Sequence, residues 1–129
     1  MKPICSRSAF LVAEDDEMLC EMISLFLTKL KYEVIITARG EEALSILEYG
    51  EDIAGLYTDI HLGGRVDGWE LGAAFHNRWP ARPIVYASSR AQSLERVAPT
   101  GLFLQKPFAL ARLTAALMAL QADLHLESA

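Results

Sequence analysis

The sequence has little cysteine and no long apolar run. Its two cysteines, Cys5 and Cys20, form neither a CxxC motif nor a disulfide framework, so a reducing, cytoplasmic setting is expected. No uncharged apolar stretch reaches about 18 residues, which excludes a membrane-spanning helix. The apolar run at 9–13 is too short for a signal peptide, and acidic residues follow it at once. We therefore expect no membrane insertion.

An excess of positive charge is also absent. Lys and Arg number 12 against 17 Asp and Glu, giving the 129 residues a formal net charge of −5. An acidic chain has no general attraction to nucleic acid, so we expect no direct nucleic-acid binding. Repeats, linkers and biased tracts are missing, and apolar residues make up 52% of the chain. These features indicate one globular domain with its own core.

Short apolar runs alternate with amphipathic segments along the chain. The apolar runs predict five strands, at 9–13, 33–37, 53–58, 84–88 and 102–105. The amphipathic segments predict helices at 17–30, 40–49 and 67–79, with a last helix opening at Pro107. Such alternation predicts an α/β fold, a three-layer sandwich whose parallel sheet binds ligands at the carboxyl ends of its strands.

Two local features of these segments add detail. The apolar stripe of the first helix includes Met18 and Met22, which we expect to face inward with the rest of the stripe. Between the fourth and fifth strands, residues 90–99 leave room for about one or two helical turns.

Polar side chains follow four of the predicted strands. They are Glu14, Asp15 and Asp16 after the first, Asp59 after the third, Ser88 and Ser89 at the end of the fourth, and Lys106 after the fifth. If the first and third strands are neighbours, their carboxylates share one pocket. Two such charges about 4 Å apart repel by about 4 kcal/mol at an effective dielectric constant of about 20, so the pocket needs a cation. Oxygen ligands with an open face favour Mg²⁺.

A carboxylate, a divalent metal, an ammonium and a hydroxyl are the groups that stabilise a phosphoryl group arriving at a carboxylate. Each group alone has a simpler interpretation, as a helix cap, a turn residue or a solvated lysine. Their common position at strand ends favours a functional site. The segments that carry this pattern are FLVAEDD (10–16), YTDIHLGGRVDGWEL (57–71), PIVYASS (83–89) and FLQKPF (103–108).

In these segments the sequence resembles the receiver domain of bacterial two-component response regulators. The resemblance covers roughly residues 7–122, leaving short tails at 1–6 and 123–129. It implies a flavodoxin-like fold, with a five-stranded parallel sheet of order 2-1-3-4-5 and helices on both faces.

The resemblance also implies a phosphorylation site. Asp59 matches the phospho-accepting aspartate, and Glu14 and Asp15 match the acidic pair that holds Mg²⁺. The backbone carbonyl of His61 would complete the metal ligands together with Asp59. Asp16 lies one place beyond the acidic pair and is not expected to bind the metal.

Other roles follow from the same resemblance. Ser88 matches the switch hydroxyl, Ser89 would offer its backbone N–H to the phosphoryl group, and Lys106 matches the lysine that pairs with that group. Phe103 matches the aromatic switch position. Arg90 and His61 would flank the entrance and tune hydrolysis. The bond from Lys106 to proline is expected to be cis, as in the family.

Two departures from the family are visible. The stretch between Ser88 and Lys106 is short, so the fourth helix should be short or irregular, which puts the family's common output and dimer surface in doubt. The acceptor loop LGGRVDG has one residue more than the commoner form, so its conformation should differ.

The implied partners are a sensor histidine kinase or a histidine phosphotransfer protein, a downstream protein and, as a further option, a second copy of the chain. Such a domain gains and loses its own phosphoryl group and is not a conventional turnover enzyme. A phosphorylation-independent interaction module with the same fold is one alternative, and a fragment of a longer regulator with an output domain is another. A Mg²⁺-dependent aspartyl phosphatase would need a D-x-D pair at the first strand end and a cap domain, whereas this strand ends in adjacent acids.

Overall fold

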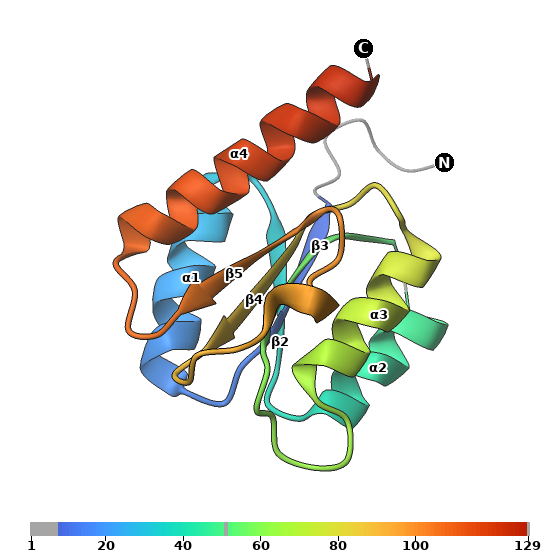
Figure 1. The fold of residues 1–129 in the computed structure, drawn as a ribbon, viewed down its shortest axis with the longest axis vertical. Coiled ribbons are helices and arrows are strands. Elements are labelled where there is room, and N and C mark those ends of the chain that lie inside the picture. Colours follow the sequence, from blue (N-terminus) through green and yellow to red (C-terminus); the bar gives the residue numbers. More distant parts are fainter. Residues whose placement is uncertain (1–7, 51, 129) are drawn as a thin grey trace.

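A computed structural model describes residues 8–50 and 52–128, and its centre is a five-stranded parallel sheet (Figure 1). The strands are β1 (Ala9–Ala13), β2 (Glu33–Thr37), β3 (Ile53–Asp59), β4 (Ile84–Ser88) and β5 (Gly101–Gln105). Their order in the sheet is β2-β1-β3-β4-β5, and every neighbouring pair is parallel. The predicted sheet and strand order are confirmed.

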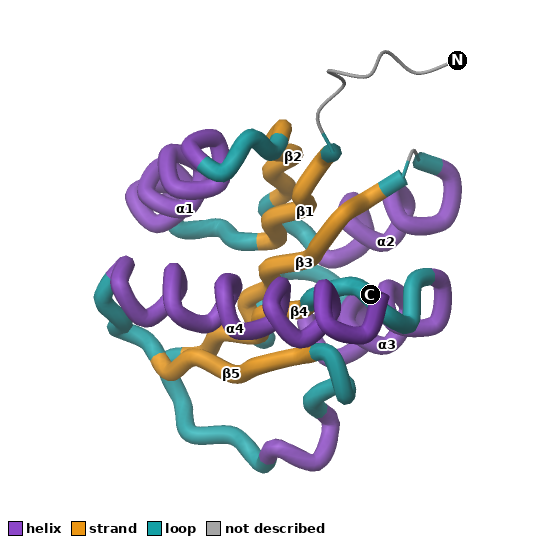
Figure 2. The backbone as a smooth tube through the Cα atoms, turned by 90° about the horizontal axis from the view of Figure 1, so that it is seen from above, coloured by secondary structure: helices purple, strands orange, loops and turns teal. Residues whose placement is uncertain are grey.

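Helices cover both faces of the sheet, as expected for a three-layer α/β sandwich. They are α1 (Glu17–Lys29), α2 (Gly40–Tyr49), α3 (Gly68–Arg78) and α4 (Leu110–Ser128). Figure 1 shows α1 and α4 on one side of the sheet and α2 and α3 on the other, and Figure 2 shows the layers from above. Within the part of the chain that the structure describes, no helix is both long and apolar enough to cross a membrane.

The connection between β4 and β5 contains a single 3₁₀ turn, η1 (Leu94–Arg96), instead of a full helix. The prediction of a short or irregular fourth helix is therefore confirmed. This stretch is held to the sheet partly by Tyr86, whose hydroxyl accepts a hydrogen bond from the backbone N–H of Ala98 at 3.2 Å.

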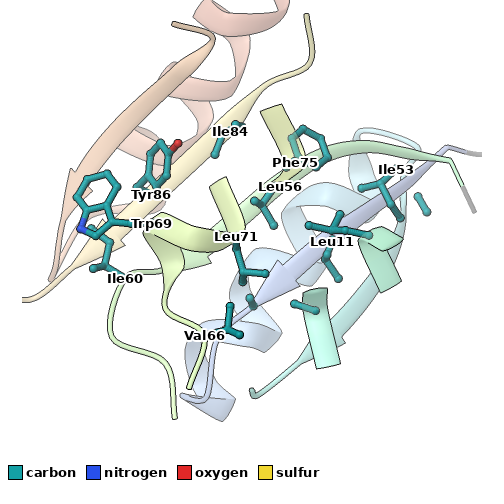
Figure 3. Close-up of a cluster of buried hydrophobic side chains, with 14 residues drawn as sticks. Leu11, Ile53, Leu56, Ile60, Val66, Trp69, Leu71, Phe75, Ile84 and Tyr86 are labelled. Carbon is teal, nitrogen blue, oxygen red and sulfur yellow. The ribbon is translucent and has the colours of Figure 1, made fainter. Parts of the chain in front are cut away.

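Alternating residues of the central strands build a separate core on each face of the sheet. Leu11 on β1 and Phe75 on α3 belong to the cluster beneath α2 and α3 (Figure 3). Val12, the next residue of β1, belongs with Leu117 of α4 to the cluster beneath α1 and α4. All five residues of β1 are buried, because a central strand covered by helices on both faces has no solvent side.

Aspartate caps start the two helices that follow β1 and β3. The side chain of Asp16 accepts a hydrogen bond from the backbone N–H of Leu19 at 3.0 Å, and Asp67 accepts one from Glu70 at 2.9 Å. A capping carboxylate satisfies one of the free N–H groups of the first turn and interacts favourably with the helix dipole. Asp16 lies only three residues after the end of β1, whereas Asp67 follows a loop that begins after Asp59.

The structure corrects the expected stripe of α1. Met18 is 75% exposed and Met22 is 42% exposed, whereas Cys20 and Ile23 are buried. The apolar stripe of α1 is therefore wider than its buried sector, whose residues are Cys20, Ile23, Phe26 and Leu27.

The last helix begins at Leu110, three residues later than Pro107, where the sequence had predicted its start. It continues to Ser128, through most of the expected tail at 123–129. The other expected tail, residues 1–6, lies outside the described residues, as does Cys5.

Candidate functional site

Three carboxylates meet where β1 and β3 end. Ala13 lies opposite Thr58 in the parallel register, so Glu14 and Asp59 leave neighbouring strands side by side. Ligand oxygens of Glu14, Asp15 and Asp59 all lie within 4.8 Å of one another. Asp15 is exposed and the other two are buried, which gives the cluster one open side. Hard oxygen ligands of this number and charge, open to water on one side, suit Mg²⁺.

The carboxylate of Glu14 is held by several donors. Its Oε2 accepts hydrogen bonds from the backbone N–H groups of Asp15 at 3.1 Å and Asp16 at 3.2 Å. Its Oε1 faces the hydroxyl of Tyr57 at 3.3 Å. Burial raises the pKa of Glu14, although the neighbouring ammonium of Lys106 opposes this effect. This carboxylate therefore has a fixed orientation in the pocket.

Lys106 brings a positive charge to the same pocket from the end of β5. Its Nζ lies 2.6 Å from Oε1 of Glu14 and 3.3 Å from Oδ2 of Asp59. Burial opposes its charged form, but the two carboxylates outweigh burial and raise the pKa of Lys106. Its backbone N–H donates to the carbonyl of Ser88 at 2.7 Å, and its peptide bond to Pro107 is cis, as the resemblance implied.

Ser88 lies at the end of β4 and is fully buried. Its hydroxyl oxygen accepts a hydrogen bond from the backbone N–H of Arg90 at 3.1 Å, and the side-chain amide of Gln92 lies 3.4 Å away. Ser89 and Arg90 are exposed beside it. The strand end thus buries the hydroxyl of Ser88 and leaves the next two residues at the surface.

Three predicted features, an acidic cluster, a lysine and a buried strand-end serine, are therefore present at one edge of the sheet. The sequence model described as "Response regulator receiver domain" matches residues 10–118, most of the chain. The chain belongs to this family of receiver domains.

Solved structures agree with this assignment. A response regulator receiver protein from Sinorhizobium medicae WSM419 is 31% identical, with a TM-score of 0.81, over 89% of this chain and 94% of that one. Two others show the same fold. The N-terminal domain of a response regulator/sensory box/GGDEF 3-domain protein from Carboxydothermus hydrogenoformans is 23% identical, with a TM-score of 0.75, over 94% of this chain and 97% of that one.

The other is a response regulator protein from Burkholderia pseudomallei, solved with a phosphorylated aspartic acid, a calcium ion and citrate. It is 24% identical, with a TM-score of 0.71, over 95% of this chain and 73% of that one. No curated protein matches the chain.

In this receiver domain, two loops meet beside Asp59. The backbone N–H of His61 donates to Oδ1 of Asp59 at 3.2 Å. The exposed ring of His61 reaches the segment after β4, where its Nε2 lies 3.2 Å from the side-chain nitrogen of Gln92. Gln92 therefore links His61 and Ser88, a connection that the sequence did not predict.

The first residue of α3 packs directly on the backbone of Asp59. The N–H of Gly68 donates to the carbonyl of Ile60 at 2.9 Å. A Cβ atom at position 68 would lie only 2.3 Å from the carbonyl oxygen of Asp59. Glycine is therefore required here by the close approach of two backbone segments.

Phe103, the predicted aromatic switch, lies on β5 opposite Tyr86. It is partly buried and packs against the cluster beneath α2 and α3. In that cluster the ring of Trp69, the second residue of α3, lies 4.9 Å from the ring of Tyr86 (Figure 3). Aromatic side chains therefore connect β5 and β4 with the start of α3.

An apolar groove of about 450 Å³ opens next to the acidic pocket. The exposed methionines Met18 and Met22 of α1 line it, together with Lys106 and Phe108. The groove therefore places apolar contact surface next to Lys106, whose ammonium contacts Glu14 and Asp59 in the acidic pocket.

Sequence reasoning missed three residues in or beside the site, Gln92, Tyr57 and Glu41. Tyr57 lies two positions before Asp59 on β3, so strand alternation places both side chains on one face, and this signal could have identified it. Glu41 contacts the loop after β3 through residues more than 20 positions away, as described below. Neither periodicity nor a motif indicates such a contact.

Proposed function

We propose that Asp59 accepts a phosphoryl group from the phosphohistidine of a sensor histidine kinase or a histidine phosphotransfer protein, and that phosphorylation changes a protein-interaction surface of residues 7–122. The observation that carries this proposal is the convergence of Glu14, Asp15 and Lys106 on Asp59. Family membership supports a phospho-accepting signalling role for this site.

Glu14, Asp15, Asp59 and the backbone carbonyl of His61 would hold Mg²⁺. The oxygen-only donors, the open side at Asp15 and the buried charge of Glu14 all fit a hard divalent cation. When bound, Mg²⁺ supplies positive charge that offsets the repulsion between the acceptor and the incoming phosphoryl oxygens. The solved Burkholderia protein, with its phosphorylated aspartic acid and calcium ion, supports this type of chemistry.

In the transfer step, a carboxylate oxygen of Asp59 attacks phosphorus. An O–P bond forms as the P–N bond to the donor imidazole breaks, and the imidazole nitrogen keeps that electron pair. The ammonium of Lys106, 3.3 Å from Oδ2 of Asp59, is placed to neutralise a phosphoryl oxygen. The hydroxyl of Ser88 and the backbone N–H of Ser89 would donate hydrogen bonds to the others.

Phosphorylation replaces the single negative charge of the Asp59 carboxylate with a phosphoryl group that carries about −1.5 to −2, by analogy with other phosphorylated residues. We propose that this charge draws the Ser88 hydroxyl and Lys106 inward, and that Phe103 then repacks into the space that Ser88 leaves. In the separate dephosphorylation step, water attacks phosphorus and the O–P bond to Asp59 breaks, which releases inorganic phosphate and restores the free carboxylate of Asp59. His61 and Arg90 flank the entrance and would tune that rate.

The donor protein would dock on the apolar groove beside the pocket. Exposed methionines are adaptable contacts, and Met18 and Met22 line this groove within the same cavity as Lys106. A phosphohistidine held by a protein seated on α1 would therefore reach Asp59 past Lys106.

The test is phosphorylation by a small donor such as acetyl phosphate with Mg²⁺, followed by intact-protein mass spectrometry. Wild type should gain one phosphoryl group, and Asp59→Asn should gain none. Asp16→Asn is the matched control, because asparagine also caps a helix and position 16 is outside the proposed metal site. Labelling of Asp59→Asn would refute the assignment. An unlabelled wild type that also fails to bind Mg²⁺ would instead favour a phosphorylation-independent module.

A further inference from the structure

Glu41, in the first turn of α2, holds the tip of the loop between β3 and α3. Its Oε1 accepts hydrogen bonds from the backbone N–H groups of Arg65 at 2.6 Å and Val66 at 3.1 Å. Two backbone donors on one carboxylate oxygen form a charge-assisted contact stronger than one between neutral groups. Its Oε2 pairs with Arg39 at 3.1 Å, a surface ion pair that contributes little by itself.

Glycines in both segments, the start of α2 and the tip of the loop, allow this contact to form. Gly64 has a φ of +94°, and a Cβ atom there would lie 2.2 Å from the Glu41 carboxylate. A Cβ atom at Gly40 would lie 1.9 Å from the carbonyl oxygen of Val66. A β-bridge also joins Arg39 to Gly63. The start of α2 and the loop tip therefore fit against each other closely, and only glycine permits the approach.

These contacts shorten the free part of the loop. Its base is closed by the hydrogen bond from Gly68 to Ile60, and its tip is fixed from Gly63 to Val66. Only His61 and Leu62 lie between Ile60 and the bridged Gly63. The one residue that provides a proposed metal-binding carbonyl, His61, is thus suspended between two fixed points.

We propose that Glu41 is a positioning residue for Mg²⁺ binding, which acts by fixing the acceptor loop so that the His61 carbonyl faces the carboxylate cluster. This inference deepens the proposed function and rests on it. Residues behind the metal ligands commonly change metal affinity when they are removed, because they set the orientation of the ligands.

The experiment compares Mg²⁺ affinity, by isothermal titration calorimetry, in wild type, Glu41→Ala, Glu41→Gln and the control Glu42→Ala. Glu42 is an exposed acid in the same helical turn, so its removal makes the same change in charge. Glu41→Ala should weaken Mg²⁺ binding by about tenfold. Glu41→Gln keeps an oxygen that can accept both N–H groups, so it and Glu42→Ala should stay within about twofold of wild type.

A second measurement separates positioning from general loss of structure. At saturating Mg²⁺, Glu41→Ala should be phosphorylated by acetyl phosphate at the wild-type rate, since only the affinity for the ion is reduced. Gly64→Ala, which would strain the backbone and collide with Glu41, should weaken Mg²⁺ binding in the same way. The Gly64→Ala variant also keeps the inference testable if Glu41→Ala does not fold.

The outcomes distinguish this inference from the proposed function. Equal Mg²⁺ affinity in wild type, Glu41→Ala and Gly64→Ala would overturn the role of Glu41 and leave the site intact. Failure of wild type itself to bind Mg²⁺ would overturn both the proposed metal site and the inference. If Glu41→Gln bound Mg²⁺ as weakly as Glu41→Ala, the positioning role of Glu41 would also be contradicted. The loss of affinity could then not be attributed to the hydrogen bonds between position 41 and the loop.

Discussion

The ammonium of Lys106 lies 2.6 Å from Oε1 of Glu14, closer than the 3.3 Å that separates it from Oδ2 of Asp59. The ammonium of Lys106 therefore makes its shorter contact with the buried Glu14 and a longer one with Asp59. Because the side chain of Glu14 is fully buried, this ion pair compensates a charge that water cannot reach.

We expect Lys106→Met to destabilise the fold by about 3 kcal/mol, because it leaves the Glu14 charge buried without a partner. The double variant Lys106→Met/Glu14→Gln should recover part of that loss, since the remaining amide carries no charge. Urea unfolding of wild type, the two single variants and the double variant gives the coupling energy. Purely additive losses would show that the two side chains do not depend on each other.

The approach of α3 to the acceptor predicts a sharp difference between two glycines. Gly68→Ala would push a Cβ atom against the Asp59 carbonyl and should cost about 2 kcal/mol of unfolding free energy. Gly63→Ala has no atom within 4 Å of the new Cβ and should change stability by less than about 0.5 kcal/mol. Thermal and urea unfolding measure both changes. Similar losses in the two variants would contradict the close packing of Gly68 on the Asp59 carbonyl.

The contact of Glu41 with the loop predicts a pH dependence of stability. Donation from the backbone N–H groups of Val66 and Arg65 lowers the pKa of Glu41 below its ordinary value of 4.5. The folded state then binds this proton less readily than the unfolded state. The contribution of the Glu41 carboxylate to folding stability is therefore present above pH 4.5. It is lost as the pH falls through the pKa that Glu41 has in the folded state.

The stability difference between wild type and Glu41→Gln should therefore shrink between about pH 7 and about pH 3, as measured by urea unfolding at each pH. Glu42→Gln serves as the control. A difference that stays constant over this range would show that Glu41 does not titrate in contact with the loop.

Substitutions in the apolar groove should affect docking of a protein donor without affecting the phosphorylation chemistry at Asp59. Met18→Ser/Met22→Ser should leave phosphorylation by acetyl phosphate unchanged, because neither side chain belongs to the acidic pocket. Transfer from a phosphorylated histidine kinase or phosphotransfer protein should fall by about tenfold, as expected when contacts worth about 1.4 kcal/mol are removed. Met118→Ser, which changes a methionine that is 59% exposed on α4, is the matched control.

If a cognate histidine donor transfers equally well to the Met18→Ser/Met22→Ser variant and to wild type, this groove is not the docking surface. Equal losses with acetyl phosphate and with the protein donor would instead point to damage in the pocket itself.

The residues at the strand ends could be predicted from sequence because parallel strands bring their carboxyl ends to one edge. Asp59 and Lys106 are 47 positions apart, yet each directly follows a predicted strand. The start of α4 could not be placed so well. Between Lys106 and Leu110 no Ser, Thr, Asp or Asn marks a cap, and proline tolerates several positions near a helix start.

Contacts between a side chain and the backbone of residues far away in the sequence could not be predicted from the sequence. In the sequence, Glu41 looks like an ordinary acidic residue in the first turn of a helix. An acid is favourable at that position because of the helix dipole, whether or not it contacts another segment. Gln92 has no periodic or motif signal at all. The exposure of Met18 was mispredicted because apolar spacing identifies the stripe of a helix but not the width of the surface that covers it.

The tight packing of Gly68 on the Asp59 carbonyl has a practical consequence. Trp69 follows Gly68 directly and its ring packs against that of Tyr86 in a tilted arrangement, so a fluorophore is already attached to the helix end that touches the acceptor peptide. Tryptophan emission, compared in wild type and Trp69→Phe, can therefore follow events at position 59 in real time without any added dye.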